Sequence, residues 1–252
     1  MPVEIQILSS SKNPLIKDVR RAADRGVLTE QGYAVCEGGH LFEEALLSGL
    51  EIGGVLISEE AAADREWPDG VPVFMLPRTV FREVATTETS QGIITLVRPR
   101  TFALDQILAG TAVLLDGIQD PGNAGAIVRA AEAFGASGVV FLKSTVSAFN
   151  PKCLRAAAGS LFRLPVVTRP DGELVRGGMK RLFAAMPDAS LSIENVDWGA
   201  GPAAIVIGSE GRGVSSEWAA EATGVRIPTT GVESLNAAVA AAVILYEARK
   251  KR

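Results

Sequence analysis

The sequence predicts an α/β protein in which a parallel β-sheet is covered by helices on both faces. In the second half of the chain, apolar runs of strand length alternate with loops and helical stretches, at residues 112–115, 139–142, 165–167, 182–184 and 203–207. Buried strands that alternate with helices are typical of parallel sheets. A smaller α/β region precedes these runs, so we expect two domains.

The first predicted domain spans residues 1–97 and is a small α/β unit. It contains a basic amphipathic stretch at 13–25, a helix around 40–48 and strands at 54–58 and 71–76. Charged residues flank Pro99, and a proline restricts the residue before it to extended conformations. We therefore place a linker at 98–108 and a second domain at 109–252.

The second predicted domain also contains sequence signals for helices. After the run 112–115, a loop rich in glycine, proline and asparagine leads into a helix with one apolar face, made of Ile127, Ala130, Ala131 and Phe134. Gly135 is expected to end this helix. The last helix is expected over 235–249, because the segment is rich in helix formers and Ser234 is a good N-cap.

Composition limits the location of the protein. The chain has 252 residues, of which 47% are hydrophobic, enough to bury a core. No apolar run approaches the roughly 20 residues that cross a bilayer. We therefore expect a cytoplasmic protein with no membrane partner. Its formal net charge of −4 argues against holding nucleic acid by bulk positive charge, although local basic patches are compatible with it.

Composition also limits the chemistry. His40 is the only histidine, which argues against histidine-based triads and multi-histidine metal sites. Cys36 and Cys153 lie far apart in sequence, without the paired spacing of zinc or iron–sulfur ligands. We therefore expect no metal, two buried reduced thiols, and acid–base chemistry that uses other groups.

Three glycine-bearing segments carry candidate functional residues. The first, residues 116–125, runs from a predicted strand into the helix that carries Arg129, and it contains Asn123. Glycines let the backbone approach a ligand, while Asn123 and Arg129 project polar groups nearby. An ordinary strand-to-helix turn with a surface arginine explains this segment about equally well.

The second segment, residues 208–213, follows the most apolar predicted strand and contains Glu210. Neither it nor 116–125 matches the dinucleotide pattern G-x-G-x-x-G or the phosphate-binding pattern G-x-x-x-x-G-K-[ST]. Taken alone, Glu210 is more simply interpreted as a solvated side chain.

The third segment, residues 227–236, leads into the final predicted helix and contains Ser234 and Asn236. Capping of free backbone amides explains Ser234 well. It explains Asn236 poorly, because a capped helix needs no second competing polar side chain in its first turn.

Together and in this order, the three segments resemble the motifs of the SpoU/TrmH family of RNA ribose methyltransferases in the SPOUT superfamily. The resemblance rests on Asn123 with Arg129 six residues later, on residues 208–213 around Glu210, and on Ile227-Pro228 followed by Ser234-Leu235-Asn236. Residues 1–97 also resemble the N-terminal RNA-binding domain that is frequent in the family. Residues 229 and 237–238 depart from the most frequent motif, which affects substrate details and not the class.

The resemblance implies a SPOUT domain with a C-terminal trefoil knot, and a homodimer whose active site is completed near the partner subunit. It implies S-adenosyl-L-methionine as the methyl donor and a ribose 2′-hydroxyl of RNA as the acceptor. Cofactor contacts are implied at Gly208, Gly211, Ile227 and Leu235. The residues implied at the catalytic end are Asn123, Arg129, Glu210, Ser234 and Asn236.

The family assigns activation of the hydroxyl to Arg129, but a guanidinium stays protonated in proteins and is a poor base. We therefore expect Arg129 to bind the adjacent phosphate and stabilise the developing alkoxide, while the proton leaves to phosphate or water. Glu210 either orients its loop or serves as the acceptor.

The two-domain layout favours ribosomal RNA of the 23S type as substrate, with transfer RNA as the alternative. RNA contacts are expected from basic residues of both domains: Lys12, Lys17, Arg20, Arg21, Arg25, Lys143, Lys152, Arg155 and Arg163. A solvated helix face explains the first five about equally well, because acidic residues interrupt them.

Two competing functions stay open. A noncatalytic RNA-binding or ribosome-assembly protein of the same fold predicts degraded motifs, and a Rossmann-type oxidoreductase predicts a fingerprint that the chain lacks.

Overall fold

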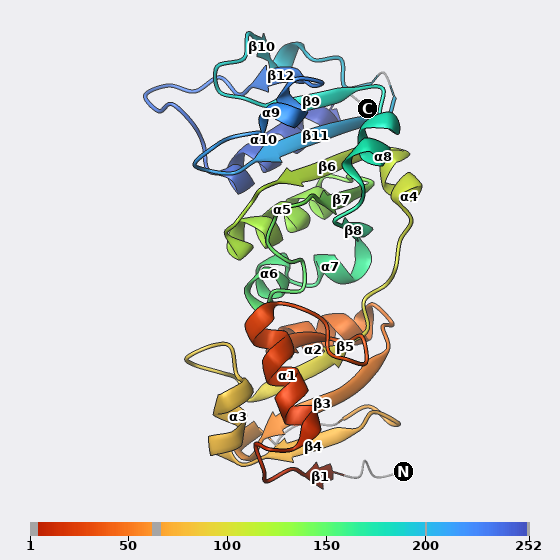
Figure 1. Cartoon of the computed structure of the whole chain (residues 1–252), viewed down its shortest axis with the longest axis vertical. Helices are drawn as coiled ribbons and strands as arrows, with labels where there is room; N and C mark the ends of the chain where they lie inside the picture. The colour runs from red at the N-terminus through yellow and green to blue at the C-terminus, as the bar shows by residue number, and fades with distance from the viewer. Residues whose placement is uncertain (1–4, 62–66, 200, 251–252) are drawn as a thin grey trace. The chain divides into compact units, whose positions relative to one another are not determined.

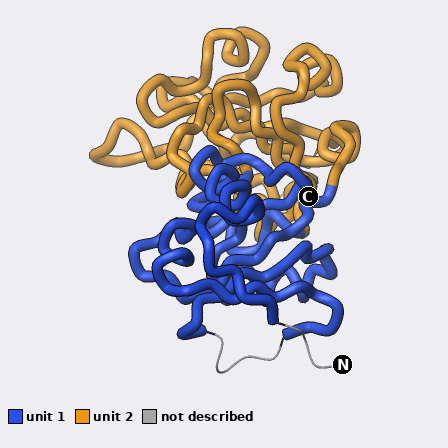
Figure 2. Tube along the Cα trace, turned by 60° about the horizontal axis from the view of Figure 1, so that its bottom comes forward, with its two compact units in different colours: residues 1–100, 149–162 blue, residues 101–148, 163–252 orange. Residues whose placement is uncertain are grey.

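The computed structural model describes residues 5–61, 67–199 and 201–250, which form two compact units (Figure 2). One unit comprises residues 1–100 and 149–162, and the other comprises 101–148 and 163–252. Residues 1–4 and 251–252, at the outer ends of the two predicted domains, lie outside the described residues. The segment 149–162, which the sequence placed in the second domain, groups with the first unit.

The first unit contains a five-stranded mixed sheet in the order β1-β4-β3-β5-β2. Figure 1 shows β1, β4, β3 and β5 in this order from the bottom of the view upward. β4 pairs in parallel with β1 and β3, whereas β5 runs antiparallel to β2 and β3. The strands are β1 (Ile5–Ile7), β2 (Ala34–Glu37), β3 (Ile52–Ser58), β4 (Val73–Leu76) and β5 (Ile93–Val97). The helices are α1 (Pro14–Arg25), α2 (Gly39–Leu47), η1 (Glu59–Ala61), α3 (Arg78–Val84), α6 (Pro151–Ala157) and most of α7 (Ser160–Arg163).

Alternation along β3 sorts the core of this unit into two layers, as expected for a strand buried on both faces. Leu56 packs with α1 and α3, whereas its neighbours Val55 and Ile57 pack with Phe42 of α2. α1 begins where the Asn13 side chain accepts a hydrogen bond from the Leu15 amide at 2.9 Å. The predicted amphipathic helix at 13–25 is therefore present, with its apolar face against the sheet.

The segment 149–162 covers part of this sheet. Leu154 of α6 and Phe162 of α7 pack with Ala34 and Cys36 of β2. Both cysteines are buried and free, as predicted, and burial raises the pKa of the Cys153 thiol to about 12. These helices follow β7 of the second unit in sequence, so their position along the chain did not predict that they belong to the first unit.

The second unit contains a seven-stranded sheet, parallel throughout, in the order β10-β12-β9-β11-β6-β7-β8. Its strands are β6 (Thr111–Asp116), β7 (Gly138–Phe141), β8 (Val166–Thr168), β9 (Leu182–Ala185), β10 (Leu191–Ser192), β11 (Ala203–Gly208) and β12 (Thr223–Arg226). Its helices are α4 (Leu104–Leu108), α5 (Pro121–Ala133), α8 (Gly172–Gly177), η2 (Ile193–Asn195), α9 (Ser216–Ala219) and α10 (Ala237–Lys250).

Helices cover both faces of this parallel sheet. α4, α8 and α9 contribute Ile107, Val175 and Trp218 to a core with Leu114 and Val206 of the central strands. α5 and α10 pack against each other, and contact β7 and β11 respectively. α4 falls within the predicted linker 98–108. In the described ranges, no helix combines the length and apolarity needed to cross a membrane.

A buried carboxylate organises the loop after α3. Glu37, only 3% exposed at the end of β2, accepts hydrogen bonds from the Thr86 amide at 2.7 Å and the Thr87 hydroxyl at 2.6 Å. The Arg155 guanidinium lies 3.8 Å away. Burial raises the pKa of this carboxyl, but hydrogen bonds from Ser90, Thr86 and Thr87 together outweigh burial and leave the pKa lowered.

Glu37→Gln is expected to lower the free energy of unfolding by about 1–3 kcal/mol at pH 7, because a charged acceptor is lost. The folded pKa lies below the unfolded value of about 4.3, so the stabilisation is present above that pH and disappears as the pH falls through the folded pKa. Urea unfolding of both proteins from pH 7 to pH 3 measures the difference between their free energies of unfolding. A difference that does not shrink in acid would contradict the stabilising role of the Glu37 carboxylate.

Candidate active site

The first motif places Asn123 in the opening turn of α5. The Asp120 side chain accepts a hydrogen bond from the Asn123 amide at 2.8 Å, and Pro121 occupies the first helical position, where no N–H is needed. The helix therefore begins directly after the carboxyl end of β6, and the Asn123 side chain is half-buried at its start.

The second motif is a closed turn at the end of β11. The amide of Ser209 donates to the Gly213 carbonyl at 3.1 Å, and the amide of Gly213 donates back to Ser209 at 2.9 Å. A Cβ atom on Gly208 would collide with the backbone of Gly213 and Val214. Glycine is therefore required at 208 by the return of the chain itself, and the turn presents Glu210 at its tip.

The third motif corrects the predicted start of the last helix. α10 begins at Ala237, and its cap is Asn236, whose Oδ1 accepts hydrogen bonds from the amides of Ala238 at 2.9 Å and Val239 at 3.3 Å. The prediction that Ser234 caps the helix was wrong. Ser234 is exposed and lies outside the helix, which begins three residues later at Ala237.

These three motifs meet in one hydrogen-bonded chain. The Asn123 Nδ2 donates to Glu210 Oε1, across 87 positions of sequence. The Asn236 Nδ2 donates to Asn123 Oδ1 at 3.1 Å, across 113 positions. Both polar ends of the Asn123 amide are therefore used, which fixes its orientation and joins the first turns of α5 and α10 to the turn after β11.

A cavity of about 300 Å³ lies beside these hydrogen-bonded side chains, at the carboxyl ends of β9, β11 and β12. Gly208, Ile227 and Leu235, three of the four predicted cofactor-binding residues, line it. Glu210 and Ser234 of the predicted catalytic set line it as well, whereas Gly211 does not and is exposed at the turn. Sequence reasoning missed other lining residues, namely Met186, Pro187, Thr229 and Glu233.

The composition of the cavity fits the predicted methyl donor. Its inner walls are apolar, with Ile207, Val225 and Ile244, and the carboxylates of Glu210 and Glu233 lie on its lining. Among the described residues that line it, none is basic. A cavity with apolar walls and uncompensated negative charge suits an apolar ring system attached to a positively charged sulfonium.

Arg129 is not brought to this site within one chain. It is exposed on α5, and six residues at about 100° each place it on a different side of the helix from Asn123. It makes no hydrogen bond or ion pair with the described part of the chain. The described residues also contain no group of three or more His, Cys, Asp or Glu side chains that could hold a metal ion.

Comparison with known proteins decides the family. Residues 110–246, which contain all three motifs, match the model of the SpoU rRNA methylase family. The chain belongs to this family. Residues 13–95 match the MRM3-like substrate binding domain, so both parts of the SpoU methylase have recognised counterparts.

Similar proteins agree with this assignment over nearly the full chain. A 23S rRNA (guanosine(2553)-2′-O)-methyltransferase of Bacillus subtilis is 34% identical over 96% of this chain and 98% of its own. The crystal structure of an AdoMet-bound rRNA methyltransferase from Sinorhizobium meliloti has 28% identity and a TM-score of 0.80, and the match covers 98% of each chain. The SpoU methyltransferase AviRb from Streptomyces viridochromogenes has 25% identity and a TM-score of 0.80, covering 95% of this chain and 98% of its own.

The α/β fold with a parallel sheet is confirmed, and so is the prediction of an S-adenosyl-L-methionine-dependent RNA ribose methyltransferase.

Replacing Gly208 with alanine is expected to disrupt the turn and reduce S-adenosylmethionine affinity at least about tenfold, because a Cβ collides with the backbone of the returning strand. Gly177→Ala in α8 is the matched control, since nothing lies within 4 Å of a Cβ there and Gly177 does not line the cavity. Titration calorimetry measures both affinities, and melting temperatures report on folding. Equal affinities in the two variants would show that the close approach at 208 is unimportant.

Proposed function

We propose that this SpoU methylase transfers a methyl group to a ribose 2′-hydroxyl of large-subunit ribosomal RNA. One observation carries the proposal: Glu210 belongs both to the cavity wall and to the hydrogen-bonded chain with Asn123 and Asn236. The donor site and the polar groups of all three motifs therefore adjoin. The choice of RNA is supported by the Bacillus subtilis relative, whose name assigns it to 23S rRNA, and by the match of residues 13–95 to a substrate-binding domain.

S-adenosylmethionine supplies a methyl carbon on a positively charged sulfur, so the protein needs mainly to position the hydroxyl and accept its proton. The 2′-oxygen bonds to the methyl carbon as the carbon–sulfur bond breaks. Glu210 takes the hydroxyl proton in this proposal, because Asn123 holds one carboxylate oxygen and the other has no partner among the described residues. The Ser234 hydroxyl and the backbones at 208, 227 and 235 hold the donor, and Gly211 stays a predicted contact at the tip of the turn.

Arg129 completes the site from a second subunit in this proposal. The homodimer that the resemblance implies is supported by apolar side chains on the outer side of α10, where Val239 is 49% and Tyr246 47% exposed. Tyr246 stacks edge-on against Phe134, at the end of the neighbouring α5, with ring centroids 5.6 Å apart. A dimer through these two helices buries this apolar area and gives the exposed Arg129 a partner. A trefoil knot and a cytoplasmic location are proposed with it, on the family resemblance.

Mapping of 2′-O-methyl groups in RNA from cells with and without the gene tests the substrate. We expect one ribose of large-subunit rRNA to lose its methyl group in the deletion and to regain it when the purified enzyme and S-adenosylmethionine are added. A site lost from transfer RNA instead, or no lost site, would contradict the proposal.

Arg129→Ala is expected to reduce methyl transfer at least about 100-fold, because it removes the cation that stabilises developing charge on the 2′-oxygen. S-adenosylmethionine affinity should change little, since Arg129 does not line the cavity. Turnover measured with tritiated cofactor, beside calorimetry, separates the two effects. Unchanged turnover would overturn the assignment of Arg129.

Mixed dimers show whether Arg129 acts on its own subunit or on the partner. In a dimer of one Arg129→Ala subunit and one Glu210→Gln subunit, action across the interface leaves one complete site. The expected activity is about half that of the normal dimer, by counting complete sites. Homodimers of each variant are the controls. A mixed dimer as inactive as these controls would contradict the shared site.

A further inference from the structure

A second cavity lies in the unit with the seven-stranded sheet, hereafter the sheet unit, and the cofactor does not account for it. It has a volume of about 500 Å³ and lies at the carboxyl ends of β6, β7, β8 and β11, because the residues that follow each of these strands line it. β6 is the strand at which the order reverses, with β7 and β8 on one side and β11 and β9 on the other. Open parallel sheets bind ligands at this switch point.

The second cavity adjoins the cofactor cavity. Ser209 and Gly213 line both, so the closed turn 209–213 forms the wall between them. A ligand in the second cavity is therefore one turn of chain away from the methyl donor. Asn123, Glu210 and Asn236 do not line it, which separates this cavity from the site where the target ribose reacts.

The carboxylates of this cavity are already engaged. Asp116 accepts a hydrogen bond from the Ser215 amide at 2.7 Å. Asp171 caps α8 by accepting from the Glu173 amide at 2.9 Å. Glu217 pairs with Arg176 at 2.5 Å. All three carboxylates are therefore held by groups of the protein, Glu217 by a cation and Asp116 and Asp171 by backbone amides.

The two basic side chains on the lining, in contrast, have no partner among the described residues. Lys143, after β7, and Arg212, in the turn after β11, are both exposed and line the cavity. Neither side chain makes a hydrogen bond or ion pair with the residues that the structure describes. Two free cations from different loops at one cavity are suited to an anion such as a phosphate.

Apolar groups form part of the remaining lining. Leu142, Pro170 and Trp218 contribute to it, and the Arg176 guanidinium lies over the Trp218 ring, 5.1 Å from its centre. A cavity that offers apolar surface beside two cations suits a nucleotide, which combines a flat base with a phosphate.

We propose that this cavity binds a nucleotide of the substrate RNA next to the methylated one, with its phosphate held by Lys143 and Arg212. The inference rests on the proposed function for the identity of the polyanion. It gives the RNA a second point of attachment on the sheet unit, on the far side of the turn that carries Glu210, and so fixes the direction in which the strand crosses the site.

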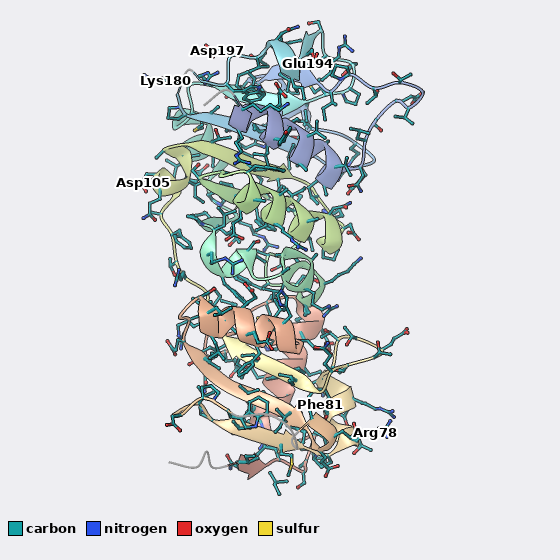
Figure 3. The ribbon with its side chains drawn as sticks, turned by 180° about the vertical axis from the view of Figure 1, so that it is seen from behind. Arg78, Phe81, Asp105, Lys180, Glu194 and Asp197 are labelled. Carbon is teal, nitrogen blue, oxygen red and sulfur yellow. The ribbon has the colours of Figure 1, made fainter. Side chains whose placement is uncertain are left out.

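The test compares Lys143→Gln with Lys180→Gln. Lys180 is also exposed but precedes β9, so it lies at the amino ends of the strands; Figure 3 shows it on the same side as Asp105, which precedes β6. Binding of a fluorescein-labelled single-stranded RNA of mixed sequence is measured by anisotropy over a range of sodium chloride concentrations. Arg212→Gln and the double variant with Lys143→Gln complete the series.

Lys143→Gln is expected to raise the Kd for this RNA at least about threefold and to reduce the slope of log Kd against log salt by about 0.7, the value for one lost phosphate contact. Arg212→Gln should do the same and the double variant should lose about twice that slope. S-adenosylmethionine affinity of Lys143→Gln should equal that of the normal enzyme. With ribosomal RNA as substrate, KM should rise while kcat is retained.

RNA affinity and salt slope in Lys143→Gln that match those of Lys180→Gln would overturn the nucleotide site while the methyltransferase assignment stands. A loss of S-adenosylmethionine affinity equal to the loss of RNA affinity would also overturn it, because the residue would then support the turn. If rRNA proves not to be the substrate, the proposed function fails, but the binding series on mixed-sequence RNA still decides whether Lys143 and Arg212 hold phosphate.

Discussion

The hydrogen bonds that join Glu210, Asn123 and Asn236 are the contacts on which the active site depends. They connect a turn after β11 with the first turns of α5 and α10, elements that are far apart in sequence. Each asparagine also serves its own helix, Asn123 through its amide and Asn236 as the N-cap. Asn123, in the first turn of α5, thus holds the carboxylate, and Asn236, the cap of α10, holds Asn123, so helix capping and site geometry are coupled.

The parallel sheet explains why such contacts are available. All pairs in the seven-stranded sheet are parallel, so the carboxyl ends of β6, β9, β11 and β12 lie along one edge and their loops converge there. Asp116, the last residue of β6, also binds the amide of Ser215 beyond the turn after β11. The turn is therefore closed on itself by Ser209 and Gly213 and anchored to the neighbouring strand, which leaves its tip with few conformations.

Sequence reasoning succeeded where a local pattern determines the structure. Apolar runs located five of the seven strands of the parallel sheet but not β10 or β12, and the three motif segments taken together indicated the family. It failed at the start of α10, where Ser234 was expected to be the cap and capping explained Asn236 poorly. Asn236 caps the helix and also donates to Asn123, a contact across 113 positions that no local pattern contains. The packing of Leu154 against the first sheet could not be predicted either, because an apolar side chain alone does not indicate which of two sheets it will contact.

Net negative charge is compatible with RNA binding because the position of the unpaired basic side chains, and not the total charge, determines where phosphate is attracted. Four of the arginines expected to contact RNA form ion pairs within the protein. Arg155 pairs with the buried Glu37, whereas Arg20, Arg21 and Arg163 form more exposed pairs with neighbouring acids. Such exposed pairs add little stability, but they cancel the local field that would attract phosphate without regard to position. Cations left unpaired among the described residues of the sheet unit include Arg129, Lys143 and Arg212, each on an element that follows a strand at the carboxyl edge. Lys180, at the amino ends of the strands, is unpaired among the described residues as well, so the carboxyl edge differs in that two unpaired cations, Lys143 and Arg212, line one cavity there. Two free cations together favour the binding of a polyanion at the edge that also holds the cofactor cavity, which total charge does not reveal.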